Sequence, residues 1–139
     1  MSLEAAIFDF VSSDAGLTAI LGAGPDCRCF PRRLPQETSR PALVYSIVSD
    51  APSYTHDQAG DPPSAPSYNR TRVQFDLWGV DYEDLTALRD ALFQGISGFR
   101  GTMGTVDIQS VFIAGQVDGF EPDTTSNRKI IDAMFSWAA

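Results

Sequence analysis

The side chains that could carry out chemistry are few, and none stands beside a matching partner in a rigid segment. His56 is the only histidine of the chain, and the neighbouring Asp57 could orient its ring. Both lie within residues 50–67, a stretch rich in proline, serine, glycine and aspartate. Catalysis needs a nucleophile, a base and oxyanion donors held within fractions of an ångström. We therefore predict no catalytic residue and interpret His56 as an exposed or interface histidine.

Metal and cofactor sites are also not expected. Asp50, Asp57 and Asp61 could gather around a cation, but their spacing lacks the glycine and the terminal glutamate of a calcium loop. Cys27 and Cys29 are the only cysteines, and side chains two apart in an extended segment have poor geometry for a mutual disulfide. Zinc would need two further ligands, which a single histidine cannot supply. We predict reduced, unreactive cysteines and no bound metal or cofactor.

Neighbouring acidic residues have a simple structural explanation. Glu83 with Asp84, and Asp76 with Asp81, could be read as acid–base pairs. Helix capping and the solvation of a strand explain them more simply. The glycines at positions 95–104 do not form a phosphate loop, because no Gly-Lys-Ser/Thr follows and the strand-then-helix context is missing.

The chain is small and strongly acidic. Its 139 residues are most consistent with one domain, and 18 acidic against 10 basic side chains give a formal charge of -8. Such a surface repels nucleic-acid backbones but lets DNA slide past without sticking. Two adjacent arginines, Arg32 and Arg33, could pair with acidic groups of a partner subunit, although solvated surface charge is the simpler interpretation. No secretory leader or membrane span is expected, because acidic residues interrupt the apolar N-terminal run.

The elements that would have to position any site centre on residues 70–99. In residues 70–78 apolar and polar side chains alternate, which predicts a half-buried strand. A helix over 82–97 should follow directly, with Asp81 as its N-cap. Its leucines and isoleucine recur at intervals of three and four residues, which indicates one buried stripe.

The rest of the chain predicts helices on either side of residue 13 and four more strands. Residues 3–11 and the segment ending near residue 21 have helical patterns, and residues 27–30 predict an edge strand because proline follows. Strands are also expected at 42–49, at 106–117 with a bulge at Gly115, and at 128–137. Residues 50–67 are predicted to form a long mobile arm, and 100–105 a flexible turn. The expected fold is a single α+β domain over 1–139, with a mostly antiparallel sheet of about 4–5 strands and helices packed on one face.

Several short motifs occur in a familiar order. They are LEAAI at 3–7, LTAILG at 17–22, RCFP at 28–31, PALVY at 41–45, RVQFDLW at 72–78, and YEDL at 82–85 followed by Leu88 and Ala91-Leu92. Together they resemble the tail completion, or tail terminator, family of long-tailed bacteriophages and gene transfer agents. The resemblance covers residues 3–99, and the last two strands match more loosely.

The resemblance implies a structural, non-enzymatic virion protein with a tail-terminator-like fold. Family members form a homo-hexameric ring on the head-proximal end of the tail tube, which stops tube growth and offers the head-tail joining surface. The expected partners are therefore other copies of the chain, the tail tube protein and a head-completion or connector protein, with DNA passing through the lumen and no membrane contact. The expected location is the virion tail at the head–tail interface, after assembly in the host bacterial cytoplasm.

An edge strand and a long arm are suitable for ring assembly, because an unpaired edge can accept a strand from a neighbour. As candidate subunit or partner contacts we select tyrosines, arginines and the histidine in or near the arm, since interface cores favour such side chains. These are Tyr54, His56, Tyr68, Arg70 and Arg72. The alternatives are a head-side completion or connector protein, a small acidic α+β hydrolase or isomerase, and a monomeric acidic binding module.

Overall fold

The computed structural model describes residues 2–53, 68–122 and 125–138. Its helices and strands occur in separate runs along a mostly antiparallel sheet, so the predicted α+β class is confirmed. In chain order the elements are α1 (Leu3–Val11), α2 (Ala15–Leu21), the short 3-10 helix η1 (Gly24–Asp26), β1 (Cys29–Pro31), β2 (Ala42–Ser53), β3 (Tyr68–Gly79), α3 (Tyr82–Ile96), β4 (Gly101–Met103), β5 (Val106–Glu121) and β6 (Ser126–Trp137).

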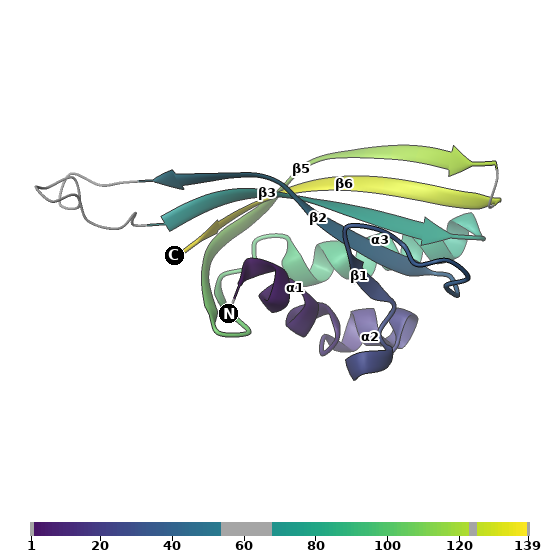
Figure 1. Ribbon diagram of the computed structural model, residues 1–139, viewed down its shortest axis with the longest axis horizontal. Helices are drawn as coiled ribbons and strands as arrows, with labels where there is room; N and C mark the ends of the chain where they lie inside the picture. Colours follow the sequence, from purple (N-terminus) through teal and green to yellow (C-terminus); the bar gives the residue numbers. More distant parts are fainter. Residues whose placement is uncertain (1, 54–67, 123–124, 139) are drawn as a thin grey trace, which may run out of the picture.

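The strands form one sheet in the order β1-β2-β3-β6-β5-β4. β1 runs parallel to β2, and every other neighbouring pair is antiparallel. β1 lies at an edge of the sheet, as predicted for residues 27–30. Figure 1 shows the sheet as a long curved layer with α1, α2 and α3 on the same side of it. The opposite face of the sheet carries no helix among the described residues.

The sheet has six strands in the described residues, so the prediction of about 4–5 strands was too low. The additional strand is β4, which the sequence analysis assigned to a flexible turn. Gly104 has a positive φ of 62° in the turn between β4 and β5, which allows Met103 to pair with Val106. A strand of three residues is too short to show the alternating pattern on which the prediction depended.

Four strands, β2, β3, β5 and β6, are longer than predicted. β2 continues to Ser53 and β3 begins at Tyr68, because the two strands pair with each other as far as those residues. β5 runs on to Glu121, where a connection was expected, and Gly119 pairs with Arg128. Cross-strand pairing therefore extends each strand through residues with low strand propensity. The predicted bulge agrees with a register shift between Ile113 and Gly115. Of the predicted arm, residues 54–67 lie outside the described residues.

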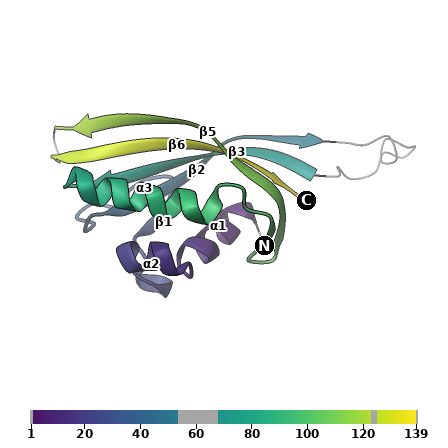
Figure 2. The ribbon, with the colours of Figure 1, turned by 180° about the vertical axis from the view of Figure 1, so that it is seen from behind.

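The centre of the core is the contact between β3 and α3. Val73, Phe75 and Leu77 alternate along β3 and are completely buried. The apolar stripe predicted for α3 is also buried, and Figure 2 shows this helix lying lengthwise along the sheet. Residues of the β3–α3 core also contact apolar side chains of β6 and of α1, so one hydrophobic cluster joins the two layers.

The helix starts follow the capping rules in two cases out of three. The Ala5 amide donates to Ser2 Oγ at 3.1 Å, and the Leu17 amide donates to Asp14 Oδ2 at 3.2 Å. Serine and aspartate are favoured N-cap residues, because their side-chain oxygens accept from amides of the first turn. Asp81 occupies the N-cap position of α3, but its side chain makes no capping hydrogen bond in the described structure. The predicted role of the Asp81 carboxylate is therefore wrong, while the predicted helix start is right.

Replacing Phe75 by alanine should lower the free energy of unfolding by roughly 3–5 kcal/mol, because a completely buried ring would leave a cavity. Urea unfolding of dilute protein followed by circular dichroism would measure this. Phe112→Ala is the matched control, since that ring is 54% exposed and should change the value by less than about 1 kcal/mol. Equal effects at both positions would contradict the placement of the core.

Candidate functional site

The predicted contact residues divide into two groups. Tyr54 and His56 lie outside the described residues. Tyr68, Arg70 and Arg72 alternate along the first half of β3 and therefore share one face of the strand. That face is opposite to the one that carries the core residue Val73. The structure thus places three of the five candidates together, beside the last residues of β2.

The two arginines of this group differ in their partners. The Arg72 guanidinium donates to Asp132 Oδ2 on β6 at 2.7 Å, and this hydrogen bond raises the pKa of Arg72. Both groups are partly exposed, so the pair contributes little to stability. Arg70 is exposed and forms no side-chain hydrogen bond or ion pair within the described residues. Its charge is therefore available to a partner.

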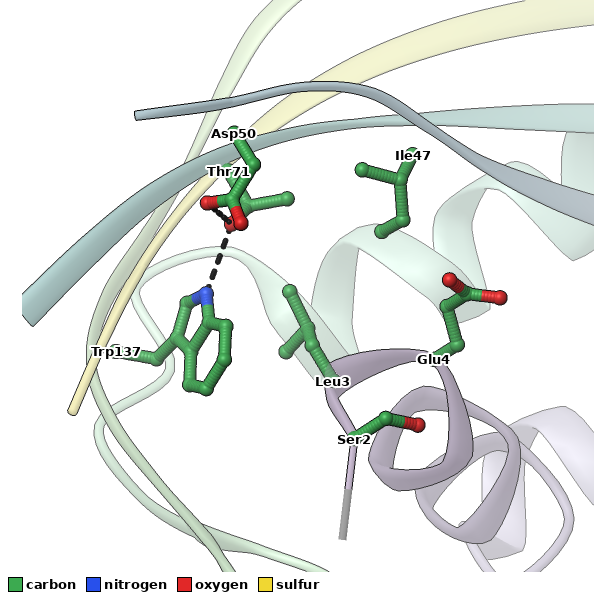
Figure 3. A pocket seen from close by; sticks show the side chains of 7 residues that line it. All are labelled: Ser2, Leu3, Glu4, Ile47, Asp50, Thr71 and Trp137. Carbon is green, nitrogen blue, oxygen red and sulfur yellow. Dashed lines mark hydrogen bonds between the residues drawn. The ribbon is translucent and has the colours of Figure 1, made fainter. Parts of the chain in front are cut away.

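A cavity of about 220 Å³ lies at the base of the β2–β3 hairpin, on the same side of the sheet as α1 (Figure 3). Leu3 and Ile47 provide apolar walls, and Glu4 stands at its side (Figure 3). Inside it, the Trp137 indole donates to Thr71 Oγ1 at 2.8 Å, and the Thr71 hydroxyl donates to Asp50 Oδ1 at 2.8 Å. This chain of hydrogen bonds joins β6, β3 and β2 at one point.

The Trp137–Thr71–Asp50 chain has a structural rather than a chemical role. Its only hydroxyl group is already donating to a carboxylate, and the described residues that line the cavity include no cysteine. Asp50 was considered as a possible cation ligand, but it is engaged with Thr71 instead. No group of three or more potential metal ligands occurs among the described residues. The network is therefore a polar link that fixes the hairpin to the end of β6.

Two buried ionic contacts were missed by the sequence analysis. Asp76 was assigned to a solvated strand face, yet it is only 7% exposed and binds Arg128 through both carboxylate oxygens. The Arg128 guanidinium also lies 4.7 Å over the Trp78 ring and 3.2 Å from Glu121. Alternation correctly placed Asp76 opposite the core, but its partner is far away in sequence. No local signal could have found it.

The second contact lies between the sheet and the start of α3. Lys129 is 3% exposed, and its ammonium donates to Asp118 Oδ1 at 2.9 Å and to the Tyr82 hydroxyl at 3.1 Å. Burial alone would lower the pKa of Lys129, but the hydrogen bonds with Asp118 and Tyr82 outweigh it and raise that pKa. The hydrogen bond from Lys129 also lowers the pKa of Asp118. Both groups are therefore charged at neutral pH.

The cysteines are free, as predicted, and the structure buries both of them. Burial raises the pKa of both thiols, most strongly for Cys29, so both remain protonated and weakly nucleophilic at neutral pH. The nearby Tyr45 behaves similarly, since burial raises its pKa to about 12. Among the residues described, no helix is long and apolar enough to cross a membrane.

Both edges of the sheet are largely open in the described structure. β1 pairs only with residues 43–45 of β2, which leaves 46–53 without a second neighbour. At the other edge β4 pairs only with residues 106–108 of β5, and the Gly98 amide donates to the Val111 carbonyl, which leaves 112–121 open. Most of the exposed large hydrophobic side chains lie on these open segments. They are Val48 on β2 and Phe112, Val117 and Phe120 on β5.

Open strands lined with exposed apolar side chains are the best candidate functional surface of this chain. The sequence pattern of the family described as tail completion protein gp17 matches residues 5–135, almost the whole chain. The chain belongs to this tail completion family. It is accordingly a structural component of a phage-type tail and not an enzyme. The resemblance of residues 3–99 is confirmed, and the match also includes the last two strands.

The fold of this tail completion protein also occurs in a solved virion. A chain of the structure titled "Virion of native gene transfer agent (GTA) particle" matches with a TM-score of 0.71 at 12% sequence identity. The match covers 99% of this chain and 96% of that chain. At this identity the likeness shows the fold alone. Comparison with curated proteins gives no significant match.

Asp118→Asn should lower the free energy of unfolding by about 1–2 kcal/mol, because it removes the charged partner of buried Lys129. The loss is limited because Asp118 itself is half exposed to solvent. Chemical denaturation at pH 7 would measure the loss. The pKa of Asp118 is lowered in the folded state, so its contribution is present above the unfolded pKa and disappears as pH falls through the folded value. The difference from the wild type should therefore shrink below about pH 4.

The matched control is Asp107→Asn, since Asp107 is an exposed carboxylate on the same strand and has no side-chain partner among the described residues. It should leave stability nearly unchanged. A pH-independent difference for Asp118→Asn, or an equal loss in the control, would count against a stabilising Lys129–Asp118 pair.

Proposed function

We propose that this protein forms a ring that caps the head-proximal end of a tail tube. The ring would end tube polymerisation and provide the surface to which the head-completion or connector protein docks. Membership of the tail completion family supports this role, and so does the similar fold of a chain in a gene transfer agent virion. The observation that carries the proposal is the pair of open, apolar sheet edges.

Two open edges on opposite sides of one subunit are what a ring requires. Identical subunits that bind head to tail contact each other through two different surfaces. Such contacts form a closed ring when the rotation from one subunit to the next is a whole-number fraction of a full turn. The open part of β5 can pair with a strand of the next subunit, because its unpaired backbone N–H and C=O groups can form hydrogen bonds with that strand. Phe112 and Val117 would be covered in that contact, which removes apolar surface from water.

The candidate contact residues of β3 lie beside the open part of β2, on an inner strand rather than at the β5 edge. Arg70 has a free charge, and Tyr68 is half-buried beside the last residues of β2. We therefore retain Tyr54, His56, Tyr68, Arg70 and Arg72 as proposed contacts with a neighbouring subunit or with the tube. The net charge of -8 suits a lumen through which DNA passes without being held. A hexamer at the head–tail interface, assembled in the bacterial cytoplasm, is part of this proposal.

A head-side completion or connector protein is the second candidate, because it would also form a ring with open edges. Deletion of the gene in the producing strain, followed by negative-stain electron microscopy of the lysate, separates the two. The capping role predicts overlong tubes without heads beside DNA-filled heads, because nothing stops polymerisation. Tails of normal length that fail to join would instead place the protein on the head side. Intact particles would contradict both roles.

Val117→Asp should prevent ring formation while the subunit remains folded, because a carboxylate at the centre of the β5 contact would be buried without a partner. Light scattering coupled to size-exclusion chromatography would report the oligomeric state. Val80→Asp is the matched control, since Val80 is similarly exposed at 60% but lies in the β3–α3 turn, outside both open edges. Normal rings from Val117→Asp, or loss of rings in the control, would exclude the β5 edge as the contact.

A further inference from the structure

A second surface, separate from the open edges, has the chemistry of an anion-binding site. It is a cavity of about 440 Å³ between the segment 32–40 and the ends of β2, β3 and β6. Asp76 and Trp78 alternate with the core residues of β3, so the cavity lies on the sheet face that is turned away from the helices. Its lining includes four of the ten basic side chains of this acidic chain. They are Arg32, Arg33, Arg40 and Arg128.

Several donors in this cavity have no acceptor. The indole N–H of Trp78 and the Nε–H of Arg40 are buried without a hydrogen-bond partner in the described structure. The guanidinium groups of Arg32 and Arg33 form no ion pair with any described residue. Buried donors are normally paired, and one left unpaired costs free energy. All of these unused groups are donors, so the missing partner is an acceptor.

The fourth arginine is not free, and it fixes the wall of the cavity. Arg128 binds both carboxylate oxygens of Asp76 and contacts Glu121 at 3.2 Å. Its guanidinium lies over the Trp78 ring at 4.7 Å, so the indole is held between fixed neighbours. The opposite wall also has a defined shape, because Arg32 adopts a φ of 70° and Glu37 a φ of 61°. Such backbone conformations persist where the surroundings determine them.

We propose that this cavity binds a carboxylate-bearing acidic polypeptide segment of a partner protein. Arg32 and Arg33 would pair with its carboxylates, and the N–H groups of Trp78 and Arg40 would donate to the same segment. Guanidinium groups bind carboxylates through two parallel hydrogen bonds, and Val44 and Leu34 offer apolar contact to the rest of the chain. The cavity is complete within one subunit, so binding does not require the ring.

Charge and shape favour a polypeptide over a nucleic acid. Asp76 and Glu37 also line the cavity, so its cationic part beside Arg32 and Arg33 is small and suits single carboxylates, whereas a nucleic-acid backbone carries a charge at every phosphate. A short acidic segment can place single carboxylates beside the arginines and keep its other groups away from Asp76. Sequence alone favoured solvated surface charge for Arg32 and Arg33. In this proposal they instead pair with carboxylates of a partner protein.

The test is calorimetric titration of the purified chain with the hexapeptide acetyl-Glu-Asp-Glu-Asp-Glu-Asp-amide at physiological salt. Three further titrants are used: the same peptide with Gln and Asn in place of Glu and Asp, inorganic phosphate, and a 12-base-pair DNA duplex. The variants are R32A/R33A, the charge reversal Arg33→Glu, and Trp78→Phe, which removes the N–H and keeps a ring beneath Arg128. Arg100→Ala is the matched control, because Arg100 is exposed and distant in the chain from the cavity lining. Circular dichroism verifies that each variant folds.

We expect the acidic peptide to bind and the neutral peptide not to bind. R32A/R33A and Arg33→Glu should weaken binding at least about tenfold, Trp78→Phe about threefold or more, and Arg100→Ala less than about twofold. No binding of the acidic peptide at millimolar concentration would overturn the proposal. Tighter binding of phosphate or the duplex, or an equal loss in Arg100→Ala, would also overturn it, because the site would then be a phosphate site or only general electrostatic attraction.

Discussion

The packing of α3 against the inner face of β3 is the contact on which the rest of this structure depends. Leu85, Leu88 and Leu92 are completely buried against alternating apolar residues of the sheet, and one hydrophobic cluster extends from there to α1 and β6. Because all three α-helices of the described residues lie on this side, the opposite face and the two edges of the sheet are left for other tasks (Figures 1 and 2). The asymmetry of the layers thus determines where partners can bind.

Polar groups in this protein mainly connect strands that are distant in sequence. The Trp137–Thr71–Asp50 chain joins three strands at one end of the sheet, and Arg128 joins Asp76 to Glu121 at the other. None of these groups is arranged as a nucleophile with a base. This agrees with a structural member of the tail completion family, in which charge and hydrogen bonding define surfaces rather than a reaction.

Two surfaces of the subunit have backbone or side-chain groups without partners among the described residues. A free protein normally protects a strand edge or pairs a buried donor, because both are otherwise costly. Within the part of the chain that the structure describes, β5 has an open segment with exposed Phe112 and Val117, and a separate cavity has unpaired donors at Trp78 and Arg40. The open segment of β5 is apolar and the cavity is cationic. Because their chemistry differs, the two surfaces are suited to different partners.

The sequence by itself determined the strand–helix unit of β3 and α3, the two helices at the start of the chain, and the family. The elements depend on residues close together in the chain, where the periods of two and 3.6 follow directly from backbone geometry. The family was indicated by short motifs that occur in a characteristic order along residues 3–92. Only the tertiary structure decided that β4 is a strand, that Asp76 and Lys129 are buried, and that Arg32 and Arg33 face a cavity. Asp76 illustrates the reason, since its partner Arg128 is 52 residues away. Burial of a polar group is set by such distant partners, and no local pattern reports them.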